Sequence, residues 1–178
     1  MRKRIQACAG KVDPKRPKAR LSTKSIILQS YITDLLLYNG RKFDIRTYMM
    51  VTIVNGKIKA YWYEEGYIRT SSYMWNLAEI EDREIHLTND AVQKYSDTYG
   101  KYEAGNKLSY RDIQRYLETY EKAGKNVVYE KILPQMKEIA ALSLKASYLF
   151  LDPSKLQNNF EIFGFDFMLD SKLKPWLI

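Results

Sequence analysis

Cysteine and histidine are scarce in this sequence, which contains one of each in 178 residues, Cys8 and His86. A single cysteine cannot form an internal disulfide, and neither a Cys-x-x-Cys pair nor a second histidine is present to build a transition-metal site. The sequence also has no Ser-His-Asp set of the kind that hydrolases use. Zinc-site and triad-hydrolase functions are therefore not expected.

Long hydrophobic runs are also missing. No uninterrupted apolar stretch approaches the roughly 20 residues that span a bilayer, and no charged segment followed by a long apolar one marks a secretion signal. We therefore expect a protein of a reducing compartment with no membrane partner. With 46% hydrophobic and 13% aromatic residues, the chain can bury one core but is too short for two full-sized domains.

Positive charge is in excess only at the start of the chain. The formal net charge is +8, and residues 1–24 carry nine basic groups against one acid, Asp13, which accounts for the whole excess. Residues 25–178 hold 20 basic and 20 acidic groups (29 less nine, and 21 less one). A nucleic-acid module normally shows a basic face on the fold itself, so no nucleic-acid partner is expected. Composition predicts that residues 1–24 are a disordered basic arm and that residues 25–178 form the domain.

Four segments have the branched composition or the alternation of β-strands, namely residues 25–32, 42–54, 57–64 and 159–170. Asn55-Gly56, between the second and third of these segments, is a strong hairpin signal, and Asn39-Gly40 predicts a turn before the second. A last strand is expected to open at Trp176.

Two helices are predicted in the second half of the chain. Ser109 and Asp112 have the spacing of a capping box, so a helix is expected from Tyr110 to Ala123, ended by Gly124 in a left-handed turn. A second helix should run over residues 127–147. Its apolar side gathers residues at helical spacing that suit a core more than a ligand site: Val128, Ile132, Met136, Ile139, Ala140 and Ser143. Residues 66–107 are polar and rich in tyrosine, and we interpret them as functional loops with short helical stretches near 73–80 and 90–95. Strands and helices in this order predict an α+β fold.

Charged side chains share one face of the strand predicted at residues 42–54. Residues two apart in a strand point the same way, so Lys42, Asp44 and Arg46 line one side. Two interpretations stay open, a solvated ladder of charges and a site for an anionic ligand rich in hydroxyl groups, such as a nucleotide.

The strand at residues 159–170 repeats this arrangement. Phe163, Phe165 and Phe167 are expected to face the core, which leaves Gly164, Asp166 and Met168 on the other side. Asp166 could hold a magnesium ion and Met168 could pack against a flat base, although a carboxylate in a strand is commonly just exposed. His86, in the segment HLTN, could act as a general base or as a structural hydrogen-bonding group.

Five segments, taken together and in this order, resemble the tubulin-tyrosine ligase family: LLLYNGRKFDIR (35–46), EEGYIRTSS (64–72), HLTNDAVQK (86–94), YGKYEAGN (99–106) and FEIFGFDFMLDSKLKPWLI (160–178). The resemblance covers about residues 25–178. It implies an ATP-grasp fold, in which ATP lies between two α+β lobes. Here it would be a partial ATP-grasp domain, without the N-terminal lobe and without the last metal-binding strand segment.

The resemblance also implies roles for individual residues. Gln29, Tyr31 and Ile32 match the hinge strand beside the adenine, and Met168 matches the residue packed on that ring. Lys42 and Asp44 match nucleotide contacts, and Thr88 and Asn89 match contacts on the phosphate side. Arg46 and Arg69 match the catalytic arginines that face the phosphates and substrates. Asp166 matches a magnesium-binding carboxylate.

The implied cofactors are ATP and Mg²⁺, and the implied partners are a free amino acid and the acidic C-terminal tail of tubulin. A carboxylate would be activated by phosphoryl transfer from ATP, and an amine would attack the acyl phosphate to form an amide. The implied location is the cytoplasm, in association with microtubules or cilia. The wording of HLTN and YGKYEAGN favours the ligase proper or a glycylase-like relative.

The sequence departs from the family pattern in ways that matter for activity. The family continues past the position of Ile178 with a Glu-Val-Asn segment that supplies two further magnesium ligands, and Ser30 stands where the hinge usually has lysine. A fragment with impaired activity by itself is therefore expected, since one carboxylate holds magnesium weakly. The alternative is a non-catalytic protein that binds tubulin through its basic arm.

Overall fold

The computed structural model describes residues 28–152 and 158–178. The chain divides into two units, residues 1–31 and 32–178. Residues 28–31 of the first unit are exposed and have no regular secondary structure. The predicted arm, residues 1–24, lies outside the described residues. The strand predicted at residues 25–32 is wrong over residues 28–32, because strand propensity is realised only where a neighbouring strand pairs with the segment.

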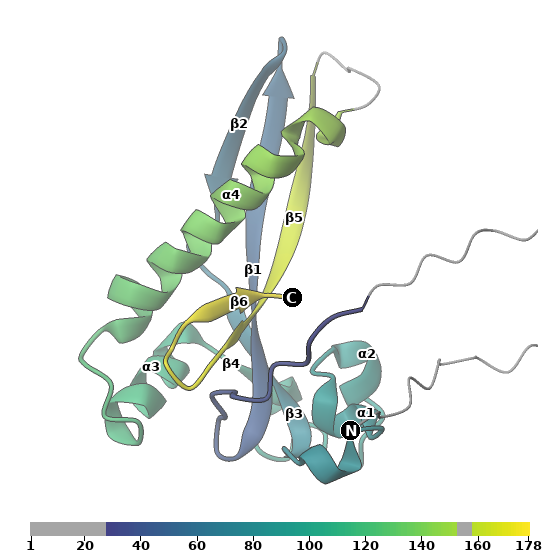
Figure 1. Cartoon of the computed structure of the whole chain (residues 1–178), viewed down its shortest axis with the longest axis vertical. Helices are drawn as coiled ribbons and strands as arrows, with labels where there is room; N and C mark the ends of the chain where they lie inside the picture. The colour runs from purple at the N-terminus through teal and green to yellow at the C-terminus, as the bar shows by residue number, and fades with distance from the viewer. Residues whose placement is uncertain (1–27, 153–157) are drawn as a thin grey trace, which may run out of the picture. The chain divides into compact units, whose positions relative to one another are not determined.

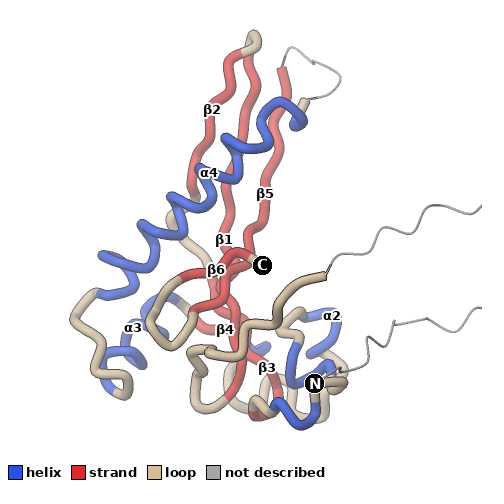
Figure 2. Tube along the Cα trace, in the orientation of Figure 1, coloured by secondary structure: helices blue, strands red, loops and turns tan. Residues whose placement is uncertain are grey.

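An antiparallel sheet of six strands forms the centre of the second unit (Figures 1 and 2). The strands are β1 (Arg41–Val54), β2 (Lys57–Trp62), β3 (Tyr67–Met74), β4 (Lys107–Leu108), β5 (Asn158–Leu169) and β6 (Pro175–Leu177). Their order is β4-β3-β1-β5-β6, and β2 pairs with β1 outside this path. On one edge β1 pairs first with β3 and then with β2, and on the other edge it pairs with β5 over most of its length.

The two Asn-Gly dipeptides form tight turns at the two ends of β1, as predicted. Asn39 and Gly40 have φ of 47° and 73°, and Asn55 and Gly56 have φ of 49° and 74°. Positive φ at both central residues is the geometry whose twist matches that of paired strands, and asparagine and glycine adopt it with little strain. These turns fix where β1 begins and ends, and so fix which of its side chains face which way.

The helices lie between β3 and β5 along the chain. They are α1 (Arg83–His86), α2 (Asp90–Gln93), α3 (Tyr110–Thr119), α4 (Leu133–Leu151), the 3-10 turns η1 (Leu77–Glu79) and η2 (Ala104–Asn106), and the π-helical turn η3 (Val128–Ile132). The capping box of Ser109 and Asp112 begins α3 as predicted. The helix ends at Thr119 rather than Ala123, and Lys122, not Gly124, takes the left-handed conformation. Pro134 lies in the first turn of α4, where its missing N–H leaves no hydrogen bond unmade.

The strand β3 corrects the prediction of loops over residues 66–107. It has only one buried hydrophobic residue, Ile68, and its other buried positions are polar. Of the helical stretches predicted near 73–80 and 90–95, the first holds the end of β3 and the turn η1, and the second holds α2. The α+β class is confirmed.

The core lies between one face of the sheet and the helices. Phe43, Ile45 and Phe167 come from the strands, and α3 and α4 contribute buried residues that include Leu117 and Met136. Each fully buried side chain of this size contributes about 1.5–3 kcal/mol. The predicted apolar side of the second helix is confirmed for Val128, Ile132, Met136, Ile139 and Ala140, which are buried in the core clusters or packed against them, whereas Ser143 lines a cavity.

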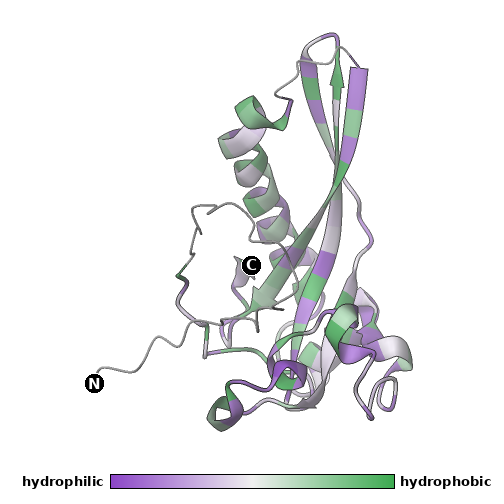
Figure 3. Cartoon of the chain, turned by 90° about the vertical axis from the view of Figure 1, so that its right-hand side faces the viewer, coloured by the Kyte–Doolittle hydropathy of each residue, from purple (hydrophilic) through white to green (hydrophobic). Residues whose placement is uncertain are grey.

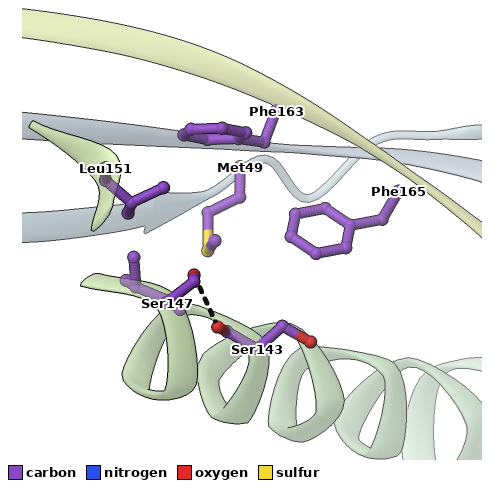
Figure 4. Close-up of a pocket in the computed structure, with 7 residues that line it drawn as sticks. Met49, Ser143, Ser147, Leu151, Phe163 and Phe165 are labelled. Atoms are coloured by element: carbon purple, nitrogen blue, oxygen red, sulfur yellow. Dashed lines mark hydrogen bonds between the residues drawn. The ribbon is translucent and has the colours of Figure 1, made fainter. Parts of the chain in front are cut away.

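Further along, α4 packs against the upper part of β1 and β5 and leaves a small cavity of about 160 Å³ (Figure 4). Met49, Phe163 and Phe165 line it from the sheet. Ser143 and Ser147 line it from α4, and both hydroxyls donate to helix carbonyl oxygens four residues earlier, at 2.9 and 2.8 Å. The cavity is thus apolar in character, because its hydroxyl donors are already used. No helix of the described residues is long and apolar enough to cross a membrane.

Candidate functional site

Charged residues gather on the face of the sheet opposite the core. Phe43 and Ile45 in β1 point into the core, so the alternating residues Lys42, Asp44 and Arg46 occupy the other face, as predicted. The pairing of β1 with β3 and with β5 brings one charged residue from each of these strands onto the same face. Arg69 of β3 lies opposite Asp44, and Asp166 of β5 lies opposite Arg46.

Asp44 and Arg69 form a buried, two-pronged ion pair. The Arg69 Nε and NH2 groups donate to the two carboxylate oxygens of Asp44 at 2.7 and 2.6 Å. Thr88 Oγ1 donates a third hydrogen bond to Asp44, at 2.5 Å. Asp44 is 2% exposed and Arg69 is 5% exposed, so this pair is shielded from water and from salt.

Asp166 joins the second arginine to this pair. Arg46 donates to both oxygens of Asp166, at 2.5 and 2.9 Å, and Arg69 NH2 lies 2.8 Å from the same carboxylate. Arg46, Asp166, Arg69 and Asp44 therefore form one chain of alternating charges, which we call the arginine network. Burial lowers the pKa of both arginines, but the hydrogen bonds and charges of their carboxylate partners raise it by more. The net pKa of each is therefore raised, and both arginines stay charged.

A glycine makes room for the exposed end of the network. Gly164 lies two residues before Asp166 in β5, and a Cβ placed on it would lie 2.9 Å from Arg46 NH1. That distance is shorter than an ordinary contact, so the absent side chain allows the guanidinium of Arg46 to lie flat against β5.

Lys42 extends the charged face toward the helical loops. Its Nζ donates to the backbone carbonyl of His86 at 2.7 Å. Burial lowers the pKa of Lys42, and the charge of Asp44 offsets only part of this effect. The His86 ring contacts the backbone carbonyl of Glu79 at 3.1 Å, which favours the structural interpretation of this histidine over that of a general base.

The remaining predicted site residues differ in how close they lie to the arginine network. Thr88 belongs to the network through Asp44. Asn89 is exposed at the start of α2 and its side chain makes no capping hydrogen bond. Met168 is 5% exposed and follows Asp166 on the same face of β5. Ile32 is half-buried outside any strand. Gln29 and Tyr31 belong to the separate unit of residues 1–31.

A second buried ion pair, which the sequence pattern did not reveal, anchors the loop before β4. Arg41 is 3% exposed and pairs with Glu103, and its guanidinium lies 4.5 Å from the centre of the Tyr102 ring. Asn106, in the left-handed conformation at φ 52°, donates to the Thr70 carbonyl and accepts from Gly100 N–H. The motif YGKYEAGN thus holds the edge of β3, the strand that carries Arg69. Asparagine beside glycine was the one available signal of such a turn.

The described residues do not by themselves make a magnesium site. No group of three or more His, Cys, Asp or Glu side chains able to hold a metal occurs within residues 28–152 and 158–178. Asp166 is the single predicted ligand, and both of its oxygens already accept from guanidinium groups. Magnesium prefers several oxygen ligands in octahedral geometry, and Asp166 offers one carboxylate that two cations already neutralise.

Anions fit the same face better. The NH1 groups of Arg46 and Arg69 donate no hydrogen bond within the described part of the chain. Guanidinium donors arranged by fixed carboxylates suit phosphate and carboxylate oxygens. Of the two guanidinium groups, that of Arg46 is the more exposed, with its side chain 24% exposed, whereas that of Arg69 lies behind it at 7%.

Comparison with known proteins gives one consistent result. The profile described as the tubulin-tyrosine ligase family matches residues 5–178. The chain is 37% identical over 153 residues to tubulin glycylase 3B of Tetrahymena thermophila, covering 85% of this chain and 12% of the relative. It is 35% identical over 157 residues to a probable alpha-tubulin polyglutamylase, Ttll1, of the same organism, covering 87% and 36%. It is 34% identical over 161 residues to the probable tubulin polyglutamylase TTLL9 of Bos taurus, covering 90% and 33%. The chain thus spans about a third of the length of the two polyglutamylases and much less of the glycylase.

Proposed function

This chain belongs to the tubulin-tyrosine ligase family, and from that premise we propose that the whole protein is an ATP- and magnesium-dependent ligase that joins an amino acid to tubulin through an amide bond. The observation that carries the proposal is the arginine network, which gathers Arg46 and Arg69 on the open face of the sheet. We propose that residues 25–178 are part of an ATP-grasp domain, and that this part supplies the charged face of the sheet.

The reaction would need charge neutralisation more than an acid-base pair. Phosphoryl transfer from ATP activates a carboxylate, and attack by an amine on the acyl phosphate releases inorganic phosphate. Negative charge develops on phosphoryl and carbonyl oxygens in both steps, and preorganised cationic donors stabilise it. Arg46 and Arg69 are the proposed catalytic residues, because carboxylates already hold both guanidinium groups in place and the Arg46 side chain is partly exposed.

Other residues would bind the nucleotide. Lys42 and Asp44 lie on the same face as the two arginines, and Thr88 is hydrogen-bonded to Asp44. We assign these three, with Asn89, to the phosphate and sugar side of ATP. We assign the adenine side to four residues: Gln29, Tyr31, Ile32 and Met168.

Magnesium would reach this face together with ATP. Asp166 is the one residue of the chain that we assign to it, and the ordinary ligand number of magnesium then requires oxygens from phosphate, water or protein outside the described residues. Because Asp166 is engaged by two arginines, we propose that this chain alone binds Mg-ATP weakly and has impaired activity. The proposed location is the cytoplasm, at microtubules or cilia.

An amino-acid transfer assay tests the proposal. Purified chain, and a chain extended at both ends to the length of the polyglutamylases, are incubated with ATP, magnesium, labelled Tyr, Glu or Gly, and peptides of tubulin C-terminal tails. We expect ATP-dependent incorporation of one amino acid by the extended chain, and its loss on Arg69→Ala. The matched control is Arg115→Ala, an exposed arginine of α3 away from the network.

Absence of incorporation of all three amino acids by the extended chain would refute ligase activity. The alternative, a non-catalytic tubulin-binding protein, would then be supported by a second pair of results. Deleting residues 1–24 would abolish tubulin binding, and Mg-ATP would leave the melting temperature unchanged.

A further inference from the structure

The upper part of the sheet is apolar on its uncovered face. α4 lies along one side of the β1, β2 and β5 segment, and no helix of the described residues lies along the other (Figure 3). An antiparallel sheet with one face in water normally alternates apolar and polar residues, with the polar ones outward. Here the outward positions are largely apolar: Tyr48, Met50 and Val54 in β1, Tyr61 in β2, and Phe160 and Ile162 in β5.

The register brings these side chains into rows across the three strands. Tyr61, Met50 and Ile162 lie side by side, and Lys59, Thr52 and Phe160 form the next row toward the hairpin tip. Ile162 is 56% exposed and Phe160 is 68% exposed. A contiguous exposed apolar patch of this kind marks an interaction site more often than a plain surface.

The patch is hollowed. A cavity of about 490 Å³ is lined by Tyr48, Met50, Tyr61, Trp62, Tyr63 and Ile162. We call this cavity the aromatic groove. Tyrosine side chains combine apolar area with few rotatable bonds, so they lose little entropy on binding a partner.

Between the aromatic groove and the hairpin tip, the charges on the outward face of β1, β2 and β5 have one sign. Lys57 and Lys59 are exposed on the outward side of β2 and form no ion pair within the described residues. No outward position of β1, β2 or β5 carries a carboxylate between the hairpin tip and Asp166. At the other end of the groove lies Arg46, which is next to Tyr48 on the same face and is paired with Asp166. The hairpin-tip end of the groove is therefore complementary to a negatively charged partner with some apolar side chains.

The distance between the charged residues at the two ends of the groove limits the shape of the partner. Lys59 pairs with Thr52, and Thr52 lies six residues from Arg46 along β1. At about 3.4 Å per residue the two cations are roughly 20 Å apart, which an extended peptide of about six residues spans.

We propose that the aromatic groove is the docking site for an extended acidic segment of the acceptor protein. Carboxylates of the segment pair with Lys57 and Lys59, apolar side chains enter the groove, and the segment is directed toward Arg46. This inference rests on the proposed function only in taking the bound peptide to be the acceptor. Binding of the peptide does not depend on ligase activity.

Fluorescence anisotropy tests the docking directly. The probe is a labelled eight-residue peptide of six glutamates and two phenylalanines, titrated with the 178-residue chain at several potassium chloride concentrations. We expect binding that weakens as salt rises. Lys59→Glu should weaken it by about tenfold, through a like charge facing the peptide, and Ile162→Ser by about threefold to tenfold. The matched controls are Lys145→Glu and Leu142→Ser, both exposed on α4 on the other side of the sheet.

Three outcomes would overturn the inference. The first is equal peptide affinity in the wild type and both groove variants. The second is that Ile162→Ser abolishes self-association in sedimentation while no peptide binds, which would assign the patch to a second copy of the chain. The third is ATP-dependent incorporation by the extended protein with the same peptide KM in the wild type and both groove variants, which would leave the ligase proposal intact. Conversely, groove-dependent peptide binding without incorporation would support the docking site and refute the ligase proposal.

Discussion

Replacing Asp44 with asparagine is the sharpest test of the arginine network. Asp44 accepts three hydrogen bonds, two from Arg69 and one from Thr88. Asparagine keeps one carbonyl oxygen, but its amide nitrogen would face a donor where the second carboxylate oxygen was. The Asp44→Asn protein therefore loses a charge, and the Arg69 guanidinium, which is 5% exposed, keeps Asp166 as its one carboxylate partner among the described residues.

The expected loss of stability follows from these contacts. Hydrogen bonds to charged groups contribute about 1.5–3 kcal/mol each, and at least one of the bonds from Arg69 is lost. Removing one partner of a buried ion pair costs about 3–5 kcal/mol, because the other charge stays buried. We expect the free energy of unfolding to fall by about 3–4 kcal/mol, which corresponds to a decrease in melting temperature of roughly 10 °C for a domain of this size.

Urea unfolding followed by circular dichroism measures this difference. The matched control is Asp90→Asn, which breaks an ion pair with Lys107 at 2.8 Å whose two side chains are 45% and 42% exposed. An exposed pair contributes about 0–1 kcal/mol, so the control should be nearly neutral. If Asp44→Asn were no more destabilising than Asp90→Asn, the network would not be a buried structural unit and the reasoning above would be wrong.

Three further predictions concern the edges of the network and the last turn. Gly164→Ala should lower the free energy of unfolding by about 1–2 kcal/mol in urea titrations, because the new methyl group would displace the guanidinium of Arg46. Asp170 accepts hydrogen bonds from Trp176 Nε1 at 3.0 Å and from two backbone amides. Burial raises the pKa of Asp170, but these hydrogen bonds lower it by more, so the pKa lies below its ordinary value. Its contribution is thus complete above the unfolded pKa of about 3.9 and is lost as pH falls through the lower folded pKa, so the stability difference between wild type and Asp170→Asn should shrink below about pH 4 in acid titrations. Magnesium chloride without nucleotide should not raise the melting temperature in a thermal shift assay, because Asp166 is already paired; a clear rise would contradict the assignment of both its oxygens to arginine.

Local patterns were enough to predict the strands on either side of the Asn-Gly turns. Alternation then placed Lys42, Asp44 and Arg46 on one face, because it follows from strand geometry alone. The same argument placed Asp166 on the face of β5 opposite Phe163, Phe165 and Phe167. In these places the residues that decide the structure lie next to one another in the sequence.

β3 could not be predicted in the same way. Its buried residues include Arg69, Thr70 and Ser72, which local composition favours in loops. They are buried because partners far away in the sequence satisfy them: Asp44 pairs with Arg69, and Gln93 accepts from the backbone of Ser72 at 2.8 Å. The pairing of Arg69 with Asp44 depends on the register of β1 and β3, and no pattern within either strand encodes that register.

The turns at the two ends of β1 restrict how this strand can change in length. Deleting one residue between them would exchange the two sides of the strand and bring Phe43 and Ile45 out to solvent while Asp44 entered the core. Deleting or inserting two residues would keep each side chain on its own side. Natural variants of this strand are therefore expected to differ in length by even numbers, a constraint that neighbouring loops do not share.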